Sequence, residues 1–213
     1  MALHLHRAEG RRRATRLLFL VHNYGGSEHA LATVGTLLDP TGRFAVVCPR
    51  GSIATDDVPG GASFYRIDRA SHTYDLPSFA AALDGLDESL DRACAEGGFE
   101  RTETVIGGYS QGGGLALALA YRRTTRPRPA AVVAFSPPIH PVERVAWDLQ
   151  AATTVAAFVT HGHRDRTFPA EASAAFVTAL RAAGADAEWH GQEAGHQLTI
   201  EALAQARDWL AAH

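Results

Sequence analysis

Hydrophobic positions gather into two kinds of segment that alternate along the whole chain. One is a short run rich in Val, Phe, Ile and Leu, typical of a β-strand, and the other is a longer Ala- and Leu-rich stretch, typical of an α-helix. The predicted strands cover residues 16–22, 43–48, 103–109, 130–135, 154–160 and 185–190. The predicted helices cover residues 27–38, 77–96, 111–123, 169–183 and 198–211. This alternation predicts an α/β fold, a mostly parallel central sheet with helices on both faces.

The strongest strands are continuously apolar, which is expected of strands that helices cover on both faces. One stretch conflicts with simple periodicity, because Leu and Ala alternate from Leu115 to Ala120 with the period of a strand. Leu and Ala are the best helix formers, however, and the stretch contains no β-branched residue. We therefore predict a helix that is apolar all round and buried.

A chain of 213 residues is within the range of one α/β domain. We expect residues 1–15 to form an N-terminal extension or a first strand, and residues 16–213 to form a single domain. The stretch from Arg50 to Leu76 is long, rich in Gly and Asp, and aperiodic. Loops of this length are usually functional, so it is a candidate wall of a binding site. The gap from Ser136 to Ala152 has room for about one short helix, so no large lid domain is expected.

Composition excludes several classes of function. All 20 basic residues are Arg and none is Lys, which excludes Schiff-base enzymes, P-loop proteins and protein kinases. A net charge of -3 and a pI near 6.4 argue against a nucleic-acid-binding protein. Cys48 and Cys94 form no C-x-x-C pattern, so we interpret both as reduced thiols.

The apolar run from Leu17 to Val21 is too short for a signal peptide or a membrane span, so we expect no membrane insertion and a cytoplasmic location. The oligomeric state stays open, a homo-oligomer included.

A G-x-S-x-G motif carries the chemistry. Gly108-Tyr109-Ser110-Gln111-Gly112 follows a predicted strand and opens the predicted buried helix, which is the context of a nucleophile elbow. The turn is so sharp that only glycines fit on either side of the serine, and it holds the hydroxyl at the carboxyl edge of the sheet. We therefore predict that Ser110 is the nucleophile.

A serine nucleophile requires a base and an orienting carboxylate, which follow it in the chain order Ser, Asp, His. Asp165 comes just after the apolar strand 154–160, and His196 lies in the loop before the last predicted helix. Both loops are at the sheet edge of Ser110, because catalytic groups collect outside the carboxyl ends of parallel strands. Asp148 is the alternative acid, and His190 and His163 are the alternative bases.

The pair His161 and His163 also suggests a metal site, but two histidines without a third ligand nearby are a weak zinc signal. The serine chemistry itself needs no cofactor and no metal, and we predict neither.

For the oxyanion hole, we predict the backbone N–H groups of Gln111, which follows the nucleophile, and of Tyr24, in the Gly-rich turn after the first predicted strand.

With these motifs in order, the chain resembles an α/β-hydrolase of the small phospholipase/carboxylesterase group from about residue 15 to the C-terminus. The resemblance implies a lidless serine esterase that acts on small carboxylic esters, thioesters or lysophospholipids. The chain departs from the group twice: Asn23 replaces the Gly of the family's His-Gly turn, and the aromatic pair Phe64-Tyr65 stands where the family usually has a Trp.

We therefore expect a carboxylesterase-type enzyme whose partner is a small-molecule ester. A thioesterase, lysophospholipase or lactone hydrolase with the same three residues is the alternative, and a non-catalytic binding module on this scaffold is a further one. The predicted substrate pocket contains Asn23, Phe64, Tyr65, Trp147 and Phe168. Its aromatic walls favour short or compact acyl groups.

Overall fold

The protein is described by a computed structural model that covers residues 3–6, 14–68, 73–142, 144–151 and 153–213. Within these residues, seven strands form one sheet in the order β1-β3-β2-β8-β9-β10-β11. The strands are β1 Leu3–His6, β2 Arg16–Val21, β3 Phe44–Pro49, β8 Thr104–Tyr109, β9 Ala131–Phe135, β10 Ala156–Gly162 and β11 Ala187–Gln192. Only β1 runs antiparallel to its neighbour, so the predicted, mostly parallel sheet is confirmed.

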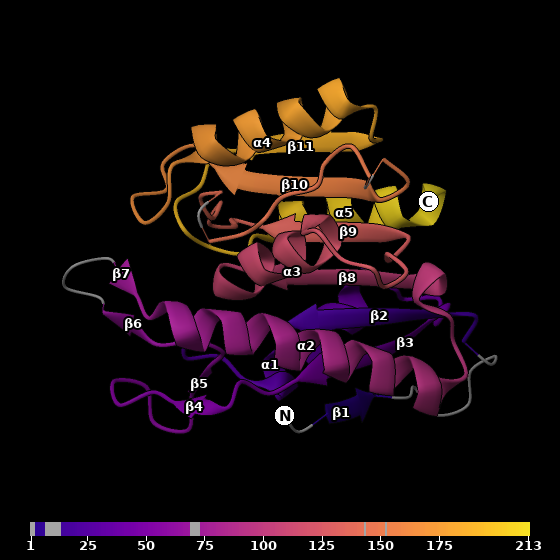
Figure 1. The fold of residues 1–213 in the computed structure, drawn as a ribbon, viewed down its shortest axis with the longest axis horizontal. Helices are drawn as coiled ribbons and strands as arrows, with labels where there is room; N and C mark the ends of the chain where they lie inside the picture. The colour runs from indigo at the N-terminus through magenta and orange to yellow at the C-terminus, as the bar shows by residue number, and fades with distance from the viewer. Residues whose placement is uncertain (1–2, 7–13, 69–72, 143, 152) are drawn as a thin grey trace.

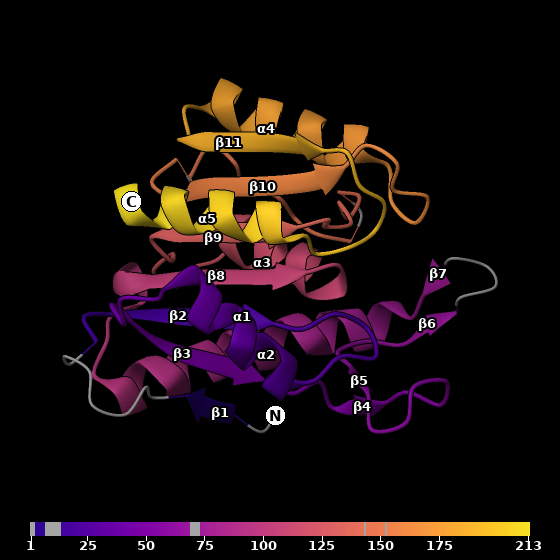
Figure 2. The same cartoon turned by 180° about the vertical axis from the view of Figure 1, so that it is seen from behind.

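Helices cover both faces of this sheet. The helices α2 (Leu76–Gly97), α3 (Gln111–Tyr121) and α4 (Ala170–Ala183) pack on one face (Figure 1). The helices α1 (Glu28–Leu38) and α5 (Ile200–Ala212) pack on the other (Figure 2). Strand β2 is continuously apolar because helices cover both of its faces. Leu17 and Phe19 contribute to the core under α2 and α3, and Leu18 contributes to the core under α1 and α5.

The alternating Leu and Ala stretch is helical, as predicted. All the residues of α3 are buried, including Tyr121 at its end. No other helix of the described residues is buried along its whole length, because the others keep an exposed side. This central helix therefore lies between the sheet and the elements that cover it.

The long stretch 50–76 contains two small antiparallel strand pairs that the pattern did not predict. They are β4 (Ile53–Ala54) with β5 (Ala62–Ser63), and β6 (Ile67–Asp68) with β7 (Thr73–Tyr74). Residues 69–72 of this predicted loop lie outside the described part of the chain. In Figures 1 and 2 these pairs lie at the same edge of the sheet as the loops that follow β10 and β11.

Cys48 and Cys94 are free and buried. Burial raises the pKa of Cys48 to about 12 and that of Cys94 to about 11, so both thiols stay protonated near neutral pH.

None of the helices in the described residues has the length and apolar character that a membrane span requires.

An ion-pair cluster joins three segments at the edge opposite these loops. The buried carboxylate of Asp87, on α2, accepts hydrogen bonds from Arg101 at 2.5 Å and from Arg122 at 2.7 Å. Arg101 belongs to the short 3-10 helix η1 (Arg101–Glu103) before β8, and Arg122 follows α3. Burial alone would raise the pKa of Asp87, but the two guanidinium groups outweigh it and lower that pKa below its ordinary value.

We predict that Asp87→Ala lowers the free energy of unfolding by about 3–5 kcal/mol at neutral pH, since the buried Arg101 and the partly buried Arg122 both lose the buried carboxylate that they share. Urea denaturation measures this loss. Because the folded-state pKa is lowered, the ion pairs stabilise the fold above the ordinary carboxyl pKa, and this stabilisation disappears as the pH falls through the folded value. The difference between wild type and variant should therefore shrink in acid.

The matched control is Asp84→Ala, which removes a carboxylate that pairs with Arg122 from an exposed position. Its expected cost is about 1 kcal/mol or less. Equal losses in the two variants would contradict a special role for the buried carboxylate.

Candidate active site

Ser110 occupies a strained turn between β8 and α3. Its backbone has φ 53° and ψ -120°, a conformation that costs a non-glycine residue about 1–3 kcal/mol. A hydrogen bond of 2.9 Å from its N–H to the carbonyl of Phe135, at the end of β9, helps to hold the turn. The hydroxyl is thereby fixed at the carboxyl edge of the sheet, directly before the N-terminus of α3.

The flanking glycines let α3 approach the sheet closely. A Cβ on Gly112 would lie 1.9 Å from the carbonyl oxygen of Val21, at the end of β2. A Cβ on Gly108 would lie 2.5 Å from the same oxygen and 2.5 Å from the carbonyl carbon of Gly112. Since these neighbours are backbone atoms, they cannot move aside without moving the strand, and any side chain at either position would displace the turn.

Three side chains from three different loops form one hydrogen-bonded chain at this edge. Nε2 of His196 lies 2.8 Å from Oγ of Ser110, and Nδ1 of His196 lies 2.7 Å from Oδ2 of Asp165. Because Nδ1 faces a carboxylate, it carries the proton, and Nε2 is left to accept the proton of the serine hydroxyl. This arrangement is the one that acyl transfer by a serine requires.

The loops that carry Asp165 and His196 are bound to each other. The N–H of His163 donates to Gln192 at 2.8 Å, and the N–H of Arg164 donates to Ala194 at 2.9 Å. The loops approach so closely that a Cβ on Gly162 would lie 2.3 Å from the carbonyl oxygen of Ala194. The distance between the acid and the imidazole is therefore set by backbone contacts.

The carboxylate of Asp165 is fully buried and saturated with donors. Oδ1 accepts from the N–H groups of Thr167 at 2.7 Å and Phe168 at 3.0 Å. Oδ2 accepts from His196 and from His161, the latter at 3.0 Å. Burial would raise the pKa of Asp165, but the bonds from Phe168, His196 and Thr167 outweigh it and lower that pKa, so the group is an anion near neutral pH.

Aromatic groups orient the imidazole of His196. The ring of Tyr109 is stacked on it with centroids 5.4 Å apart, and the Tyr109 hydroxyl donates to the carbonyl of His196 at 3.0 Å. The ring of Phe168 meets the imidazole edge-on at 5.4 Å. Phe168, named as a pocket residue from the sequence, therefore lies directly beside His196.

The turn after β2 carries the predicted donor Tyr24. It is supported by His22, whose ring is fully buried: Nε2 accepts from the N–H of Gly51 at 3.0 Å, and Nδ1 donates to the carbonyl of Asn23 at 2.7 Å. Burial lowers the pKa of His22, which keeps the ring neutral and this pattern of donor and acceptor intact. The Asn23 amide donates to the carbonyl of Tyr24 at 2.8 Å, so this side chain braces the turn.

Gln111, the other predicted donor, is the first residue of α3, where a backbone N–H has no acceptor within the helix. Its side chain is buried. Oε1 accepts from the N–H of Phe64 at 3.0 Å, and Nε2 donates to Oγ of Ser63 at 3.0 Å. The side chain thus binds the long segment 50–76 to the nucleophile turn.

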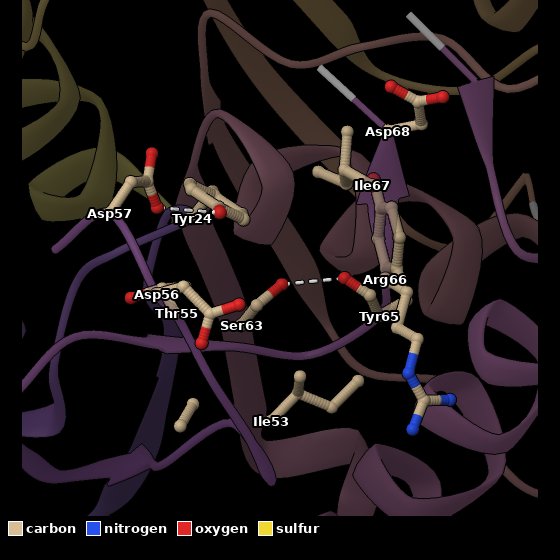
Figure 3. Close-up of a pocket in the computed structure, with 11 residues that line it drawn as sticks. Tyr24, Ile53, Thr55, Asp56, Asp57, Ser63, Tyr65, Arg66, Ile67 and Asp68 are labelled. Carbon is tan, nitrogen blue, oxygen red and sulfur yellow. Dashed lines mark hydrogen bonds between the residues drawn. The ribbon is translucent and has the colours of Figure 1, made fainter. Parts of the chain in front are cut away.

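A cavity of about 570 Å³ lies beside this junction (Figure 3). Tyr24, Ser63 and Tyr65 form part of its wall, and the hydroxyl of Tyr24 donates to Asp57 at 2.8 Å. Three carboxylates, Asp56, Asp57 and Asp68, line it together with the guanidinium group of Arg66. The cavity is polar and acidic. Of the residues expected in the substrate pocket, only Tyr65 lines it, and Ser110 and His196 do not.

Comparison with known proteins agrees with this architecture. A family model described as Phospholipase/Carboxylesterase matches residues 5–213. The chain belongs to the phospholipase/carboxylesterase family. Among curated proteins, the putative hydrolase MhqD of Bacillus subtilis (strain 168) is 28% identical over 193 residues, which is 91% of each chain.

Solved structures of similar fold include esterase PE8, with TM-score 0.81 and 24% identity over 99% of this chain and 97% of that one. The Bacillus cereus carboxylesterase matches with TM-score 0.80 and 23% identity over 99% of this chain and 92% of that one. The predicted α/β-hydrolase fold is confirmed, and family membership makes this protein a carboxylesterase-type hydrolase.

Two residues expected in the pocket of this family member lie elsewhere. Trp147 pairs through its backbone with Arg122, which follows the end of α3 away from Ser110, and its ring packs on Phe176 of α4. Trp147 thus belongs to the packing over α3. Phe64 is buried against the ring of His22 and is not among the residues that line the cavity. Periodicity cannot show which way a loop side chain turns. Phe64 was chosen for its aromatic ring, its place on the long loop and its place in the family pattern, and Trp147 for its aromatic ring in a loop.

The alternative residues have other partners. Asp148 pairs with Arg128 at 3.4 Å, and His190 contacts Glu188 at 2.8 Å. The ring of His163 packs edge-on against Trp189, whereas both nitrogens of His161 have protein partners. Within the described residues, no group of three or more His, Cys, Asp or Glu side chains is placed to hold a metal ion.

We predict that Gly112→Ala destabilises the protein by about 3 kcal/mol and reduces ester turnover more than 100-fold, because α3 must move away from Val21 and carry the turn with it. Thermal unfolding and steady-state kinetics measure the two effects. The control is Gly195→Ala, beside His196, where a Cβ would meet its nearest atom at 3.7 Å. Near-normal stability of the Gly112 variant would contradict the close approach.

Proposed function

We propose that this hydrolase cleaves small carboxylic esters through an acyl-enzyme on Ser110, with His196 as general base and acid and Asp165 as the orienting carboxylate. The observation that carries the proposal is the continuous chain of short hydrogen bonds from the Ser110 hydroxyl through His196 to Asp165. A serine hydroxyl without such a base is a poor nucleophile.

In the first half-reaction, Oγ of Ser110 attacks the ester carbonyl carbon while Nε2 of His196 takes the hydroxyl proton. The negative charge that develops on the carbonyl oxygen is stabilised by the backbone N–H groups of Gln111 and Tyr24, and the positive end of the α3 dipole adds to it. The carbon–oxygen bond to the alcohol then breaks as His196 gives its proton to the leaving oxygen.

In the second half-reaction, water attacks the acyl-enzyme, and His196 takes a proton from this water. Collapse of the second tetrahedral intermediate releases the carboxylic acid and returns the proton to Oγ. Asp165 stays ionised throughout, because its four hydrogen-bond donors favour the anion, and its charge stabilises the imidazolium that forms twice in each cycle.

The charge of the cavity beside the site argues against an anionic substrate. Among the described residues, three carboxylates and one guanidinium group line it, so a substrate with a net negative charge would be repelled there. The described residues between β9 and β10 contain no helix, which agrees with a site formed by loops and with compact acyl groups. The charge of the cavity therefore disfavours anionic lysophospholipids as substrates.

The proposal is tested by Ser110→Ala, which should reduce kcat by at least about 10⁴-fold, equal to about 5 kcal/mol of transition-state stabilisation. The melting temperature should not fall, because alanine keeps the fold and loses only the hydroxyl. Asp165→Asn should reduce kcat by up to about 10⁴-fold, whereas Asp148→Asn, the matched control, should leave it near normal. Substantial turnover by the Ser110 variant, or the reverse order of the two Asp variants, would exclude these assignments.

We also predict that kcat/KM across a series of p-nitrophenyl esters peaks at a short acyl chain. Each methylene contributes about 0.8 kcal/mol only while it reaches buried apolar surface, and a small polar site offers little of it. A choline or other cationic ester of equal acyl length should react at least as well as its neutral analogue, and an anionic one less well. A steady rise out to long acyl chains would be incompatible with a small loop-walled site.

A further inference from the structure

A second histidine contacts the carboxylate of Asp165. His161 lies in β10, its ring is fully buried, and its Nε2 is 3.0 Å from Oδ2 of Asp165. This is the same oxygen that Nδ1 of His196 contacts at 2.7 Å. The two imidazoles therefore share one carboxylate oxygen, and the serine chemistry described above uses only one of them.

The surroundings of His161 define which of its nitrogens carries a proton. Nε2 faces two acceptors, Oδ2 of Asp165 and the carbonyl of Phe168 at 3.2 Å, so it must be the N–H donor. Burial lowers the pKa of His161 despite the neighbouring carboxylate, so the ring is neutral and its Nδ1 is an acceptor.

The hydroxyl of Ser173, on α4, lies against Nδ1. Its Oγ is 3.0 Å from Nδ1 of His161, donates to the carbonyl of Ala170 at 2.8 Å and accepts the indole N–H of Trp189 at 2.9 Å. The single hydroxyl hydrogen has two acceptors within reach, the Ala170 carbonyl and Nδ1, and turning to Nδ1 stabilises the Nε2–H tautomer. The line of contacts therefore runs from Trp189 through Ser173 and His161 to Asp165.

The position of this donor affects the acid of the site. Two backbone N–H groups hold Oδ1 of Asp165. The carboxylate can still pivot about this oxygen unless Oδ2 is held as well. A neutral donor can hold Oδ2 without cancelling the negative charge, whereas a cation at this place would weaken the stabilisation of an imidazolium on His196. A buried, neutral imidazole meets both requirements.

We propose that His161 is a positioning residue for the hydrolytic reaction: by donating its Nε2–H to Oδ2, it orients the Asp165 carboxylate toward Nδ1 of His196. This role rests on the proposed function of Ser110, His196 and Asp165. The role differs from the metal site suggested by the pair His161 and His163. It involves His161 alone, and both ring nitrogens of His161 bind groups of the protein.

The test compares His161→Gln with His161→Met, two unbranched side chains of similar length of which only Gln can donate an N–H to Asp165. We expect the Met variant to lose kcat on the order of 10- to 100-fold with KM within about twofold, since a misplaced acid affects the reaction step more than substrate binding. The Gln variant should recover most of the loss. Equal activity of the two variants, at matched folded fractions, would overturn the proposal.

A spectroscopic measurement keeps the test independent of turnover. In ¹H–¹⁵N spectra of the wild-type protein and of Ser110→Ala, His161 should be the neutral Nε2–H tautomer, and the Nδ1–H proton of His196 should resonate far downfield. His161→Met should shift or broaden that His196 signal, and His161→Gln should largely restore it. A His161 protonated on Nδ1 only, or an unaltered His196 signal in the Met variant, would overturn the proposal.

Ser173→Ala extends the test if both His161 variants fold poorly, because it leaves His161 in place and removes only the donor to Nδ1. It should reduce kcat by about threefold to tenfold and weaken the Nε2–H tautomer. Wild-type kcat together with an unchanged tautomer would contradict the proposed line of contacts. Failure of the proposed function itself is distinguishable, because it appears as turnover that does not depend on Ser110.

Discussion

The close approach of α3 to the end of β2 is the contact on which the site depends. A Cβ at Gly112 would lie 1.9 Å from the Val21 carbonyl oxygen, so the helix can start where it does only with glycine at this position. The helix start in turn compels the left-handed backbone of Ser110, whose N–H is held by Phe135 of the neighbouring strand. The strained backbone of Ser110 and the close packing of α3 on β2 thus place the hydroxyl. The burial of all of α3 offsets the cost of this strain.

The parallel sheet brings the other groups to the same edge. The strands β8, β10 and β11 end at the same edge of the sheet, with β9 between β8 and β10, and the segments after them carry Ser110, Asp165 and His196. Hydrogen bonds between the loops after β10 and β11 fix the spacing of acid and imidazole, and four donors hold the Asp165 carboxylate. Each side chain of the chain from Ser110 to Asp165 has a hydrogen-bond partner within the protein, so little reorganisation is needed when charge develops.

Much of the architecture could be predicted from the sequence, because strands that are buried on both faces of the sheet are continuously apolar. The main predicted strands and helices agree with the structure to within about two residues, and composition correctly overrode periodicity in α3. The short pairs β4–β5 and β6–β7 were missed, since strands of two residues have no measurable period. The sequence also indicated that Ser110, Asp165 and His196 meet, because each follows a strand of one parallel sheet. Side-chain direction was not predictable. Phe64 turns inward from its loop, and Trp147 packs over α3. His161, in β10, contacts Asp165, whereas the sequence pattern had suggested a metal ligand.

The central claim is that catalysis proceeds through a covalent acyl-enzyme on Ser110. The most direct measurement is to react the wild-type protein with a fluorophosphonate and to locate the adduct by peptide mass spectrometry. The account predicts one adduct per chain, on the Ser110 hydroxyl. An adduct on another residue, or full esterase activity in protein that remains unmodified, would contradict it.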